Sequence, residues 1–447
     1  MSIKKNVAEL KEEMILALSE WIQVPSVLDE LDEKTPFGAG IDTALKQILN
    51  RCARLGFRTF MDPEGYYGYA EIGEGKEMIG ILGHVDVVPA GDPKNWTYPP
   101  FGGAVENGKI YGRGAMDDKG PIIAAVYAAK ALMNTGVLLN KRIRFIFGTD
   151  EENRWRGICR YKKNEELPTF GFTPDSSFPV IYAEKGLCQV VLSSDFESDF
   201  SMSGGTAINA VPEIASYEGN KIVGIEKQLK QMGFDHETEG DALYVIGKSA
   251  HAAKPNAGIN AILRLASALN SADIHSPAID FISEKIGFTT DGSLIFGDCS
   301  DDVSGTLTCS VNQIDISQYG EKVAVDFRIP VTVDPKFILD GLARVSLKYG
   351  LSVEILDEIA PLYLPKRHVL INRLSRIYFE ETGLDSEPLA TGGATYARAM
   401  SNIVAYGPLF PGQEKRAHQT DEFIEISALV TISQIYARAI ESLLKDS

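Results

Sequence analysis

The sequence has few cysteines, a deficit of basic residues and no long hydrophobic run. Its five cysteines are scattered and lack CxxC spacing, which argues against a disulfide framework and a thiolate zinc site. Lysine and arginine total 44 against 61 acidic residues, and the net charge is −17. Such a charge repels nucleic-acid phosphates and anionic membranes, and no stretch is apolar over the length of a bilayer span. We therefore expect neither nucleic acid nor a membrane as a partner.

The first 22 residues, MSIKKNVAELKEEMILALSEWI, begin with basic residues but contain no long apolar segment. Charges recur throughout, so this stretch predicts an amphipathic surface helix over 5–24 and not a signal peptide. Scattered, unpaired cysteines are typical of proteins in a reducing compartment. These two observations predict a cytoplasmic protein.

The length of 447 residues exceeds that of a usual single domain and predicts two. Buried strands predicted at 78–82 and 143–147 alternate with a helix predicted at 121–132, which indicates an α/β layer with a largely parallel sheet. From about residue 186 short alternating strands replace this pattern, and from about 366 the earlier pattern resumes. We therefore predict a discontinuous first domain, 1–185 and 366–447, interrupted by an α+β domain over 186–365.

The segment Gly83-His84-Val85-Asp86 follows the apolar run 78–82, which places His84 at the carboxyl end of a predicted strand. Ligands bind at that edge of open α/β sheets. If the strand continues, His84 and Asp86 lie on one face. The Asp86 carboxylate could then accept the proton of one ring nitrogen while the other nitrogen binds a metal. A strand-edge histidine with ordinary hydrogen bonds is the alternative.

Two acidic pairs follow. Asp117 and Asp118 come after a glycine-rich stretch and directly before a predicted buried helix. One aspartate suffices to cap a helix, and adjacent carboxylates repel each other unless a cation lies near. Glu151 and Glu152 follow the strand predicted at 143–147, at the same sheet edge as His84. A solvated acidic turn is the usual interpretation of such a sequence, but its position at this sheet edge argues otherwise. One glutamate could bind a metal and the other could act as a general base.

Asp175 lies in a turn after another possible strand, and His418 lies just before the last predicted helix. Taken alone, each is an ordinary turn or loop residue. Together with the earlier motifs they supply hard oxygen ligands and one imidazole per ion, which suits zinc or manganese. Two such sites that share a carboxylate would lie roughly 3.5–4 Å apart, as in co-catalytic hydrolases.

The order of these motifs resembles that of a known family. The sequence contains, in order, GHVDVVPAGD, WTYPPFGG, GRGAMDDKGP, GTDEE, TPDSSFP and AHQTDEF. This series resembles the dinuclear zinc metallopeptidases that include aminoacylases, glutamate-releasing carboxypeptidases and carnosinases, and most closely the bacterial PepV-type (Xaa-His dipeptidase-like) dipeptidases. The resemblance covers nearly the whole chain. It implies an α/β fold, with a zinc-peptidase-like α/β/α catalytic domain around a mainly parallel central sheet and an inserted α+β lid domain.

The resemblance also implies a role for each residue of the set. Two divalent metal ions per chain are expected, zinc foremost, with manganese or cobalt as alternatives. One ion would be held by His84 and Asp175 and the other by Glu152 and His418, with Asp117 bridging both. It further implies that Glu151 is the general base and acid, that Asp86 orients His84, and that the peptide bond between residues 117 and 118 is cis.

In the lid, the resemblance implies that Asn209, His251 and Arg328 bind the substrate carboxylate or the tetrahedral oxyanion. A cation or an imidazole donor suits developing negative charge. Gly393 lies in a Gly-Gly-Ala-Thr-Tyr segment that resembles the family's backbone contact to the C-terminal end of the substrate. The lid over 186–365 resembles the doubled lid of the PepV type, in which the chain supplies its own His251. A monomer is therefore expected.

The implied reaction is hydrolysis of unblocked dipeptides by a metal-bridging hydroxide, with Glu151 moving the proton. A lid that closes over the substrate limits its length and so favours dipeptides. An amidohydrolase of the same fold, acting on N-acyl amino acids, is the first alternative. A non-catalytic metal or peptide binder is the second, although it would require a broken ligand set, and none is broken here.

Overall fold

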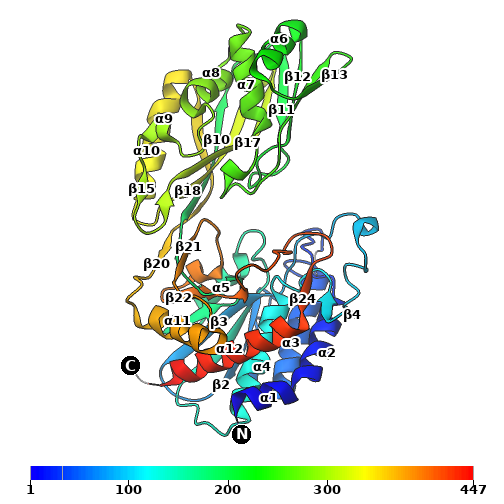
Figure 1. The fold of residues 1–447 in the computed structure, drawn as a ribbon, viewed down its shortest axis with the longest axis vertical. Helices are drawn as coiled ribbons and strands as arrows, with labels where there is room; N and C mark the ends of the chain where they lie inside the picture. The colour runs from blue at the N-terminus through cyan, green and yellow to red at the C-terminus, as the bar shows by residue number, and fades with distance from the viewer. Residues whose placement is uncertain (1, 33, 446–447) are drawn as a thin grey trace. The chain divides into compact units, whose positions relative to one another are not determined.

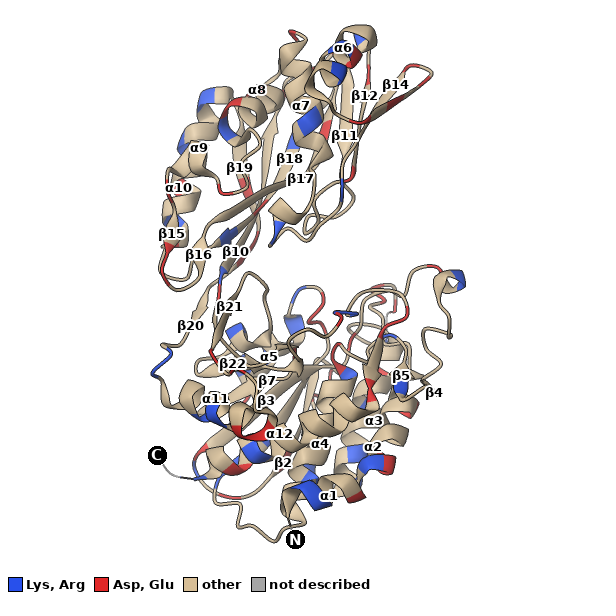
Figure 2. Cartoon of the chain, viewed as in Figure 1, with Lys and Arg blue, Asp and Glu red and all other residues tan. Residues whose placement is uncertain are grey.

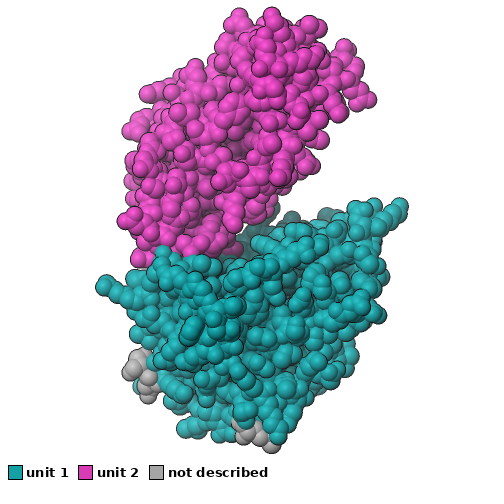
Figure 3. Space-filling model, viewed as in Figure 1, with its two compact units in different colours: residues 1–182, 364–389, 395–447 teal, residues 183–363, 390–394 magenta. Residues whose placement is uncertain are grey.

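The computed structural model describes residues 2–32 and 34–445 (Figure 1). The chain forms two compact units, coloured separately in Figure 3. Unit 1 comprises residues 1–182, 364–389 and 395–447, and unit 2 comprises residues 183–363 and 390–394. The predicted boundaries at 185 and 365 differ from the observed ones by three and two residues. The segment 390–394, which the sequence analysis assigned to the first domain, belongs to unit 2.

A mixed sheet forms the centre of unit 1. Its strand order begins β1-β2-β6-β3-β7-β22-β9. The four inner strands run parallel: β6 (Arg142–Gly148), β3 (Met78–His84), β7 (Phe170–Thr173) and β22 (Ile403–Tyr406). The flanking strands pair antiparallel: β1 (Arg58–Met61), β2 (Tyr67–Ile72) and β9 (Val180–Glu184). Every residue of β3 is buried, as expected for a strand covered on both faces.

Helices cover this sheet: α1 (Ile3–Glu9), α2 (Lys11–Ile22), α3 (Ala39–Leu55), α4 (Lys119–Met133), α5 (Arg156–Asn164), α11 (Val369–Thr382) and α12 (Ile426–Leu444). Helix α4 is buried along almost its whole length, because apart from two lysines its residues are mostly apolar on every face. Pro121 lies in its first turn, where the missing N–H costs nothing. The single helix predicted over 5–24 is instead two helices, which meet at Leu10.

Short strands connect loops of unit 1. The strands β4 (Ala104–Glu106), β5 (Lys109–Tyr111) and β24 (Phe423–Glu425) form an antiparallel sheet. The strands β8 (Ser176–Ser177) and β23 (Pro408–Leu409) form a parallel pair. The first of these sheets joins the residues that follow His418 to those that precede Asp117. None of the helices within 2–32 and 34–445 combines the length and the hydropathy that a bilayer span requires.

Unit 2 is built on an antiparallel sheet of order β13-β14-β12-β11-β17-β18-β10-β19. The strands are β10 (Gly186–Ser194), β11 (Ser201–Gly204), β12 (Ile214–Glu218), β13 (His236–Glu239), β14 (Ala242–Ile246), β17 (Thr308–Ser317), β18 (Gly320–Ile329) and β19 (Ser352–Ile359). Its helices are α6 (Ile222–Met232), α7 (Ala261–Ser271), α8 (Pro277–Phe281), α9 (Ser293–Phe296) and α10 (Pro335–Ser346). Burial alternates along β12 and β14, so one face of the sheet carries the core. Smaller strands are β15 (Ser300–Asp301), β16 (Gly305–Thr306), β20 (Leu362–Tyr363) and β21 (Leu389–Thr391).

The strand order of unit 2 repeats on either side of its centre. From the central pair outward, one side runs β11-β12-β14-β13 and the other β17-β18-β10-β19. On each side a helix, α6 or α10, connects the second strand to the outermost one. This repeated order is the arrangement that a doubled lid predicts.

Candidate active site

Predicted site residues lie at or just after the carboxyl ends of three neighbouring strands of unit 1. His84 is the last residue of β3, Glu151 and Glu152 follow β6, and Asp175 follows β7. Because these strands are adjacent and parallel, their carboxyl ends meet at one edge of the sheet. Strands β3 and β7 contain no charged residue apart from this histidine, so they are tan in Figure 2, and the acidic residues follow in the loops.

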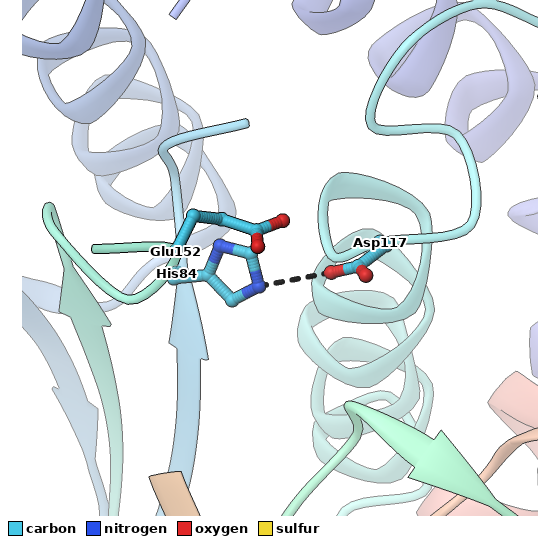
Figure 4. Close-up of side chains that lie close together, drawn as sticks. All are labelled: His84, Asp117 and Glu152. Carbon is cyan, nitrogen blue, oxygen red and sulfur yellow. Dashed lines mark hydrogen bonds and ion pairs between the residues drawn. The ribbon is translucent and has the colours of Figure 1, made fainter. Parts of the chain in front are cut away.

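Asp117 lies between the two histidines of the site. Its Oδ1 is 3.0 Å from Nε2 of His84 (Figure 4), and its Oδ2 is 3.1 Å from Nε2 of His418. It precedes α4, and its peptide bond to Asp118 is cis. Figure 4 shows the carboxylate facing the His84 ring from the start of that helix, with Glu152 beside the ring.

The remaining contacts divide the cluster into two halves. Glu152 Oε1 is 2.9 Å from Nε2 of His418, and Asp175 Oδ2 is 3.8 Å from Nε2 of His84. Two groups of side chains could each hold a metal ion, because within each group the donor atoms lie within 4.8 Å of one another. One group is His84, Asp117 and Glu152, and the other is His84, Glu151 and Asp175. The structure thus brings together all five predicted ligands and the predicted general base.

Burial and hydrogen bonds together give the acids of this cluster unusual pKa values. Burial, with repulsion from Asp175, raises the pKa of Glu151 well above its usual range. Burial, with repulsion from Asp117, does the same for Asp175. Burial opposes ionisation of Asp117 as well, but the hydrogen bonds from His418 and His84 outweigh it and hold the pKa of Asp117 well below its usual range.

The imidazoles supply the counter-charge. Burial disfavours a charged His84, but its hydrogen bond to Asp117 prevails and the pKa is raised well above 6.5. His418 is more exposed, with 52% of its side chain accessible, and its contacts with Asp117 and Glu152 raise its pKa to about 11. In the metal-free cluster, bound protons therefore offset the repulsion between the carboxylates, and divalent cations could replace those protons. Carboxylate oxygens with one imidazole in each half form a donor set that fits zinc or manganese.

Asp86 contacts more than the histidine it was expected to orient. Strand β3 ends at His84, so the predicted continuation past it does not occur. Nδ1 of His84 lies 2.9 Å from the backbone oxygen of Asp86 and 3.6 Å from its carboxylate. That carboxylate accepts the N–H groups of Glu151 at 3.1 Å and Glu152 at 3.0 Å. Asp86 therefore fixes the turn that carries both glutamates.

Tyr396 is a buried neighbour of the cluster that the sequence analysis did not single out. Its ring packs edge-on against His84 and Trp155, with centroids 6.2 and 5.3 Å away. A Cβ at Gly148 would lie 2.2 Å from the Tyr396 hydroxyl, so the end of β6 requires glycine. Two further missed residues, Arg113 and Glu422, lie inside the motifs GRGAMDDKGP and AHQTDEF, and that position was the available signal.

The predicted lid residues all lie in unit 2. Asn209 and His251 are exposed, and their segments pair through the backbone, with Ala252 N donating to Asn209 O at 2.9 Å. Gly392, next to the predicted Gly393, approaches the same loop, because a Cβ on it would lie 3.2 Å from Ala253 Cβ.

Arg328, on β18, is buried with 4% of its surface exposed. Its Nε and Nη2 donate to the two carboxylate oxygens of Asp326, at 2.7 and 3.1 Å. Its Nη1 donates to Gly392 O at 3.0 Å. Unit 2 therefore links Arg328 to the glycine segment that the sequence analysis expected to contact substrate.

Comparisons with known proteins agree with this architecture. Residues 80–442 match Peptidase family M20/M25/M40. The chain is 37% identical to "Putative dipeptidase YtjP" of Bacillus subtilis (strain 168) over 469 residues, which cover 100% of both chains. Human carnosine dipeptidase 1 matches with a TM-score of 0.63 at 15% identity, covering 99% of this chain and 98% of that one.

A second solved structure is the Bacillus subtilis YXEP protein, described as a dinuclear metal binding peptidase from the M20 family. It matches with a TM-score of 0.52 at 12% identity, covering 98% of this chain and 99% of that one. At these identities the structural matches show the fold, and they confirm the predicted α/β class with an inserted α+β unit. The family match over most of the sequence and the full-length relative confirm the resemblance inferred from the motifs: the chain belongs to Peptidase family M20/M25/M40.

Proposed function

We propose that this chain is a metal-dependent dipeptidase that hydrolyses the peptide bond of unblocked dipeptides. One observation carries the proposal: an aspartate touches two histidines at a sheet edge where three further carboxylates converge. The similarity over the full length to a protein named as a dipeptidase supports the substrate class. The likeness to carnosine dipeptidase 1 supports the fold on which such an activity occurs.

Two divalent ions would be held by the five clustered ligands. We assign His84 and Asp175 to one ion, Glu152 and His418 to the other, and Asp117 to both, with zinc foremost and manganese or cobalt as alternatives. When bound, the ions would polarise the scissile carbonyl and lower the pKa of water. The contacts of Asp117 with both imidazoles through different oxygens support the bridging assignment.

Glu151 is the proposed carrier of the proton. Its carboxyl group is raised in pKa by burial, and a general base works best when its pKa is close to the working pH. Glu151 takes a proton from the attacking water and passes it to the leaving amine. Asp86 supports this role by accepting the N–H of Glu151 and so fixing the direction of its side chain.

In unit 2, we assign His251 and Asn209 to stabilisation of the developing oxyanion, and Arg328 and Gly393 to the carboxyl end of the substrate. Exposure of the imidazole and the amide supports the first assignment. Arg328 has five N–H donors, of which Asp326 and Gly392 engage three. The other two leave capacity for a carboxylate.

We further propose a cytoplasmic monomer. The repeated halves of unit 2 support the monomer, because a duplicated lid supplies within one chain what a second copy would otherwise provide. Light scattering of the purified chain tests this, and a stable dimer would contradict it.

The deciding experiment for the function is a substrate panel. Metal-stripped protein is refilled with zinc, manganese or cobalt and assayed on free dipeptides alongside N-acetyl and N-succinyl amino acids. We expect hydrolysis of the free dipeptides that depends on added metal. Preferential cleavage of the acylated amino acids would replace the dipeptidase assignment by an amidohydrolase of the same fold. Metal binding without any hydrolysis would favour a binding protein.

A further inference from the structure

Glu422 is a fully buried carboxylate at the edge of the cluster, four residues after His418. Its Oε1 accepts three backbone N–H groups, those of Gly114 at 3.1 Å, Met116 at 2.8 Å and Asp117 at 3.1 Å. Three converging amides form a concave anion site of the kind that successive backbone N–H groups can make. A side chain from one end of the sequence thus fixes the backbone of Asp117 itself.

The second oxygen of Glu422 completes a buried ion pair. Oε2 is 2.6 Å from Nη1 of Arg113, which is 2% exposed. The same guanidinium donates to the backbone oxygen of Gln419 at 3.2 Å. Arg113 therefore connects the loop before Asp117 to the residue that directly follows His418.

Strand pairing explains why these groups meet. Phe423 of β24 lies opposite Tyr111 of β5, so the residues next to them, Glu422 and Gly112, are neighbours. Gly112 N donates to Glu422 O at 2.9 Å. Gly114 has a φ of +90°, a left-handed conformation that favours glycine, and it lets the chain turn so that its amides point at the carboxylate.

We infer that Glu422 is a positioning residue for the metal centre. It sets the distance between Asp117 and His418 by tying the loop of one to the turn of the other. This inference rests on the proposed metal-binding function of those two residues. Removing the carboxylate leaves both side chains in the sequence but releases the backbone that aims them.

A second buried arginine–glutamate pair in unit 1 provides a matched control. Glu71 accepts from Nε of Arg144 at 2.7 Å, and the two residues are 8% and 6% exposed. That pair joins β2 to β6 through side chains, and neither residue is among the proposed ligands. A purely structural role for Glu422 would make its loss resemble the loss of Glu71.

The test compares Glu422→Gln with Glu71→Gln in the full-length protein. Each variant is stripped of metal, its fold is checked by circular dichroism, and zinc and manganese affinities are measured by competition with a chelating dye. We expect Glu422→Gln to weaken at least one ion by roughly 10- to 100-fold, as is typical for groups that orient ligands, and to recover activity in excess metal. Glu71→Gln should keep the wild-type affinities. Equal affinities in folded Glu422→Gln and wild type would overturn the inference.

Arg113→Lys covers the case in which Glu422→Gln does not fold. Lysine keeps the charge beside Glu422 but lacks the planar donor set that also reaches Gln419. We expect its metal affinity to fall by about 10-fold, and an unchanged affinity would overturn the inference. The wild type separates this result from the larger proposal: a wild-type protein that binds no divalent metal refutes the proposed function, whereas normal binding by both wild type and variants refutes only the role of Glu422.

Discussion

The two units present their proposed functional residues in different ways. In unit 1, charged side chains touch one another at the ends of neighbouring strands, with Asp117 between His84 and His418. In unit 2, Asn209 and His251 are exposed, and their segments are joined through the backbone.

This difference determines how much of each proposed role can be inferred from the charges and contacts of the residues themselves. Buried carboxylates repel one another until protons or cations compensate their charge. The cluster of unit 1 therefore requires bound positive charge. Among the described residues, Asn209 and His251 belong to no such cluster, so their roles depend on the substrate that they meet. The unit 1 assignments can therefore be broken by single charge changes, whereas the unit 2 assignments need a substrate to test them.

Loss of the proton carrier should have the largest effect. Glu151→Gln keeps the shape of the side chain but cannot accept a proton, so kcat on a dipeptide should fall by roughly 100- to 10,000-fold. Metal content should stay at the wild-type level, because Glu151 is assigned as the base, and His84 and Asp175 of the same donor set remain in place. Steady-state kinetics and elemental analysis on the same sample measure both quantities.

Glu152→Gln is the matched control, since it changes the neighbouring glutamate in the same turn. Its carboxylate contacts Nε2 of His418 at 2.9 Å and is assigned as a ligand, so metal content should fall together with activity. If Glu151→Gln lost its metal, or if it turned over substrate at a near-normal rate while loaded, the two roles would have to be exchanged or abandoned.

The imidazole of unit 2 should come next in size. His251→Ala is expected to fold normally, because the side chain is exposed, and to keep its full metal content. Loss of one oxyanion donor typically lowers kcat by roughly 100- to 1,000-fold. His236→Ala, which alters another histidine of unit 2, should leave kcat near that of the wild type. An unchanged kcat in His251→Ala would reject the oxyanion role and leave the catalytic groups confined to unit 1.

Much of the unit 1 site follows from local sequence rules. An apolar run followed by a histidine, and another followed by two glutamates, predict site residues at one sheet edge, and β3 and β6 are adjacent as required. Which strands lie next to each other is a tertiary property that local sequence does not determine. The motifs suggested that these site residues converge, and the pairing of the strands explains why they do.

Other parts lay beyond such rules. The carboxylate of Asp86 accepts the backbone N–H groups of Glu151 and Glu152, and β3 stops at His84. A two-residue spacing does not reveal where a strand ends. Glu422 acts across a separation of 305 residues from Asp117, which the pairing of β24 with β5 brings about. In unit 2, only the family resemblance pointed to Asn209 and Arg328.

Metal removal should destabilise the protein in a pH-dependent way. The folded metal-free state raises the pKa of His84 and of His418, the latter to about 11. A raised pKa means that the folded state binds the proton more tightly, so this stabilisation is complete below about pH 6.5 and is lost as the pH rises toward 11. The opposite shift of Asp117 acts only in acid, below about pH 4. The metal-free protein should therefore have a lower Tm at about pH 9 than at about pH 6.

Added metal should reverse this trend, because it binds the deprotonated ligands. At 100 times the dissociation constant the gain is about 2.7 kcal/mol, which corresponds to a rise in Tm of roughly 5–10 °C for a unit of this size. Thermal melts of stripped and zinc-loaded protein at both pH values measure it. A gain that shrank with rising pH would contradict protons as the counter-charge of the unit 1 cluster.

The smallest effect is expected at Arg328. This side chain lies in unit 2 but is buried and paired, so it resembles the charged side chains of unit 1 more than the exposed Asn209 and His251. Arg328→Lys keeps the charge but lacks the planar fork of donors that engages both oxygens of Asp326 together with Gly392 O. If Arg328 binds the carboxyl end of the substrate directly or through the glycine segment, KM should rise by about 10-fold, or about 1.4 kcal/mol, while kcat changes by less than about threefold.

Arg264→Lys supplies the control for that measurement. Arg264 also lies in unit 2, but it donates to Ile246 O at 2.9 Å and packs over the ring of Phe234, whereas Arg328 donates to Gly392 O. Its KM should match that of the wild type. An equal rise of KM in both variants would mean that general loosening of unit 2 causes the effect. A fall in kcat at unchanged KM in Arg328→Lys would instead assign Arg328 to stabilisation of the transition state, the role proposed for His251.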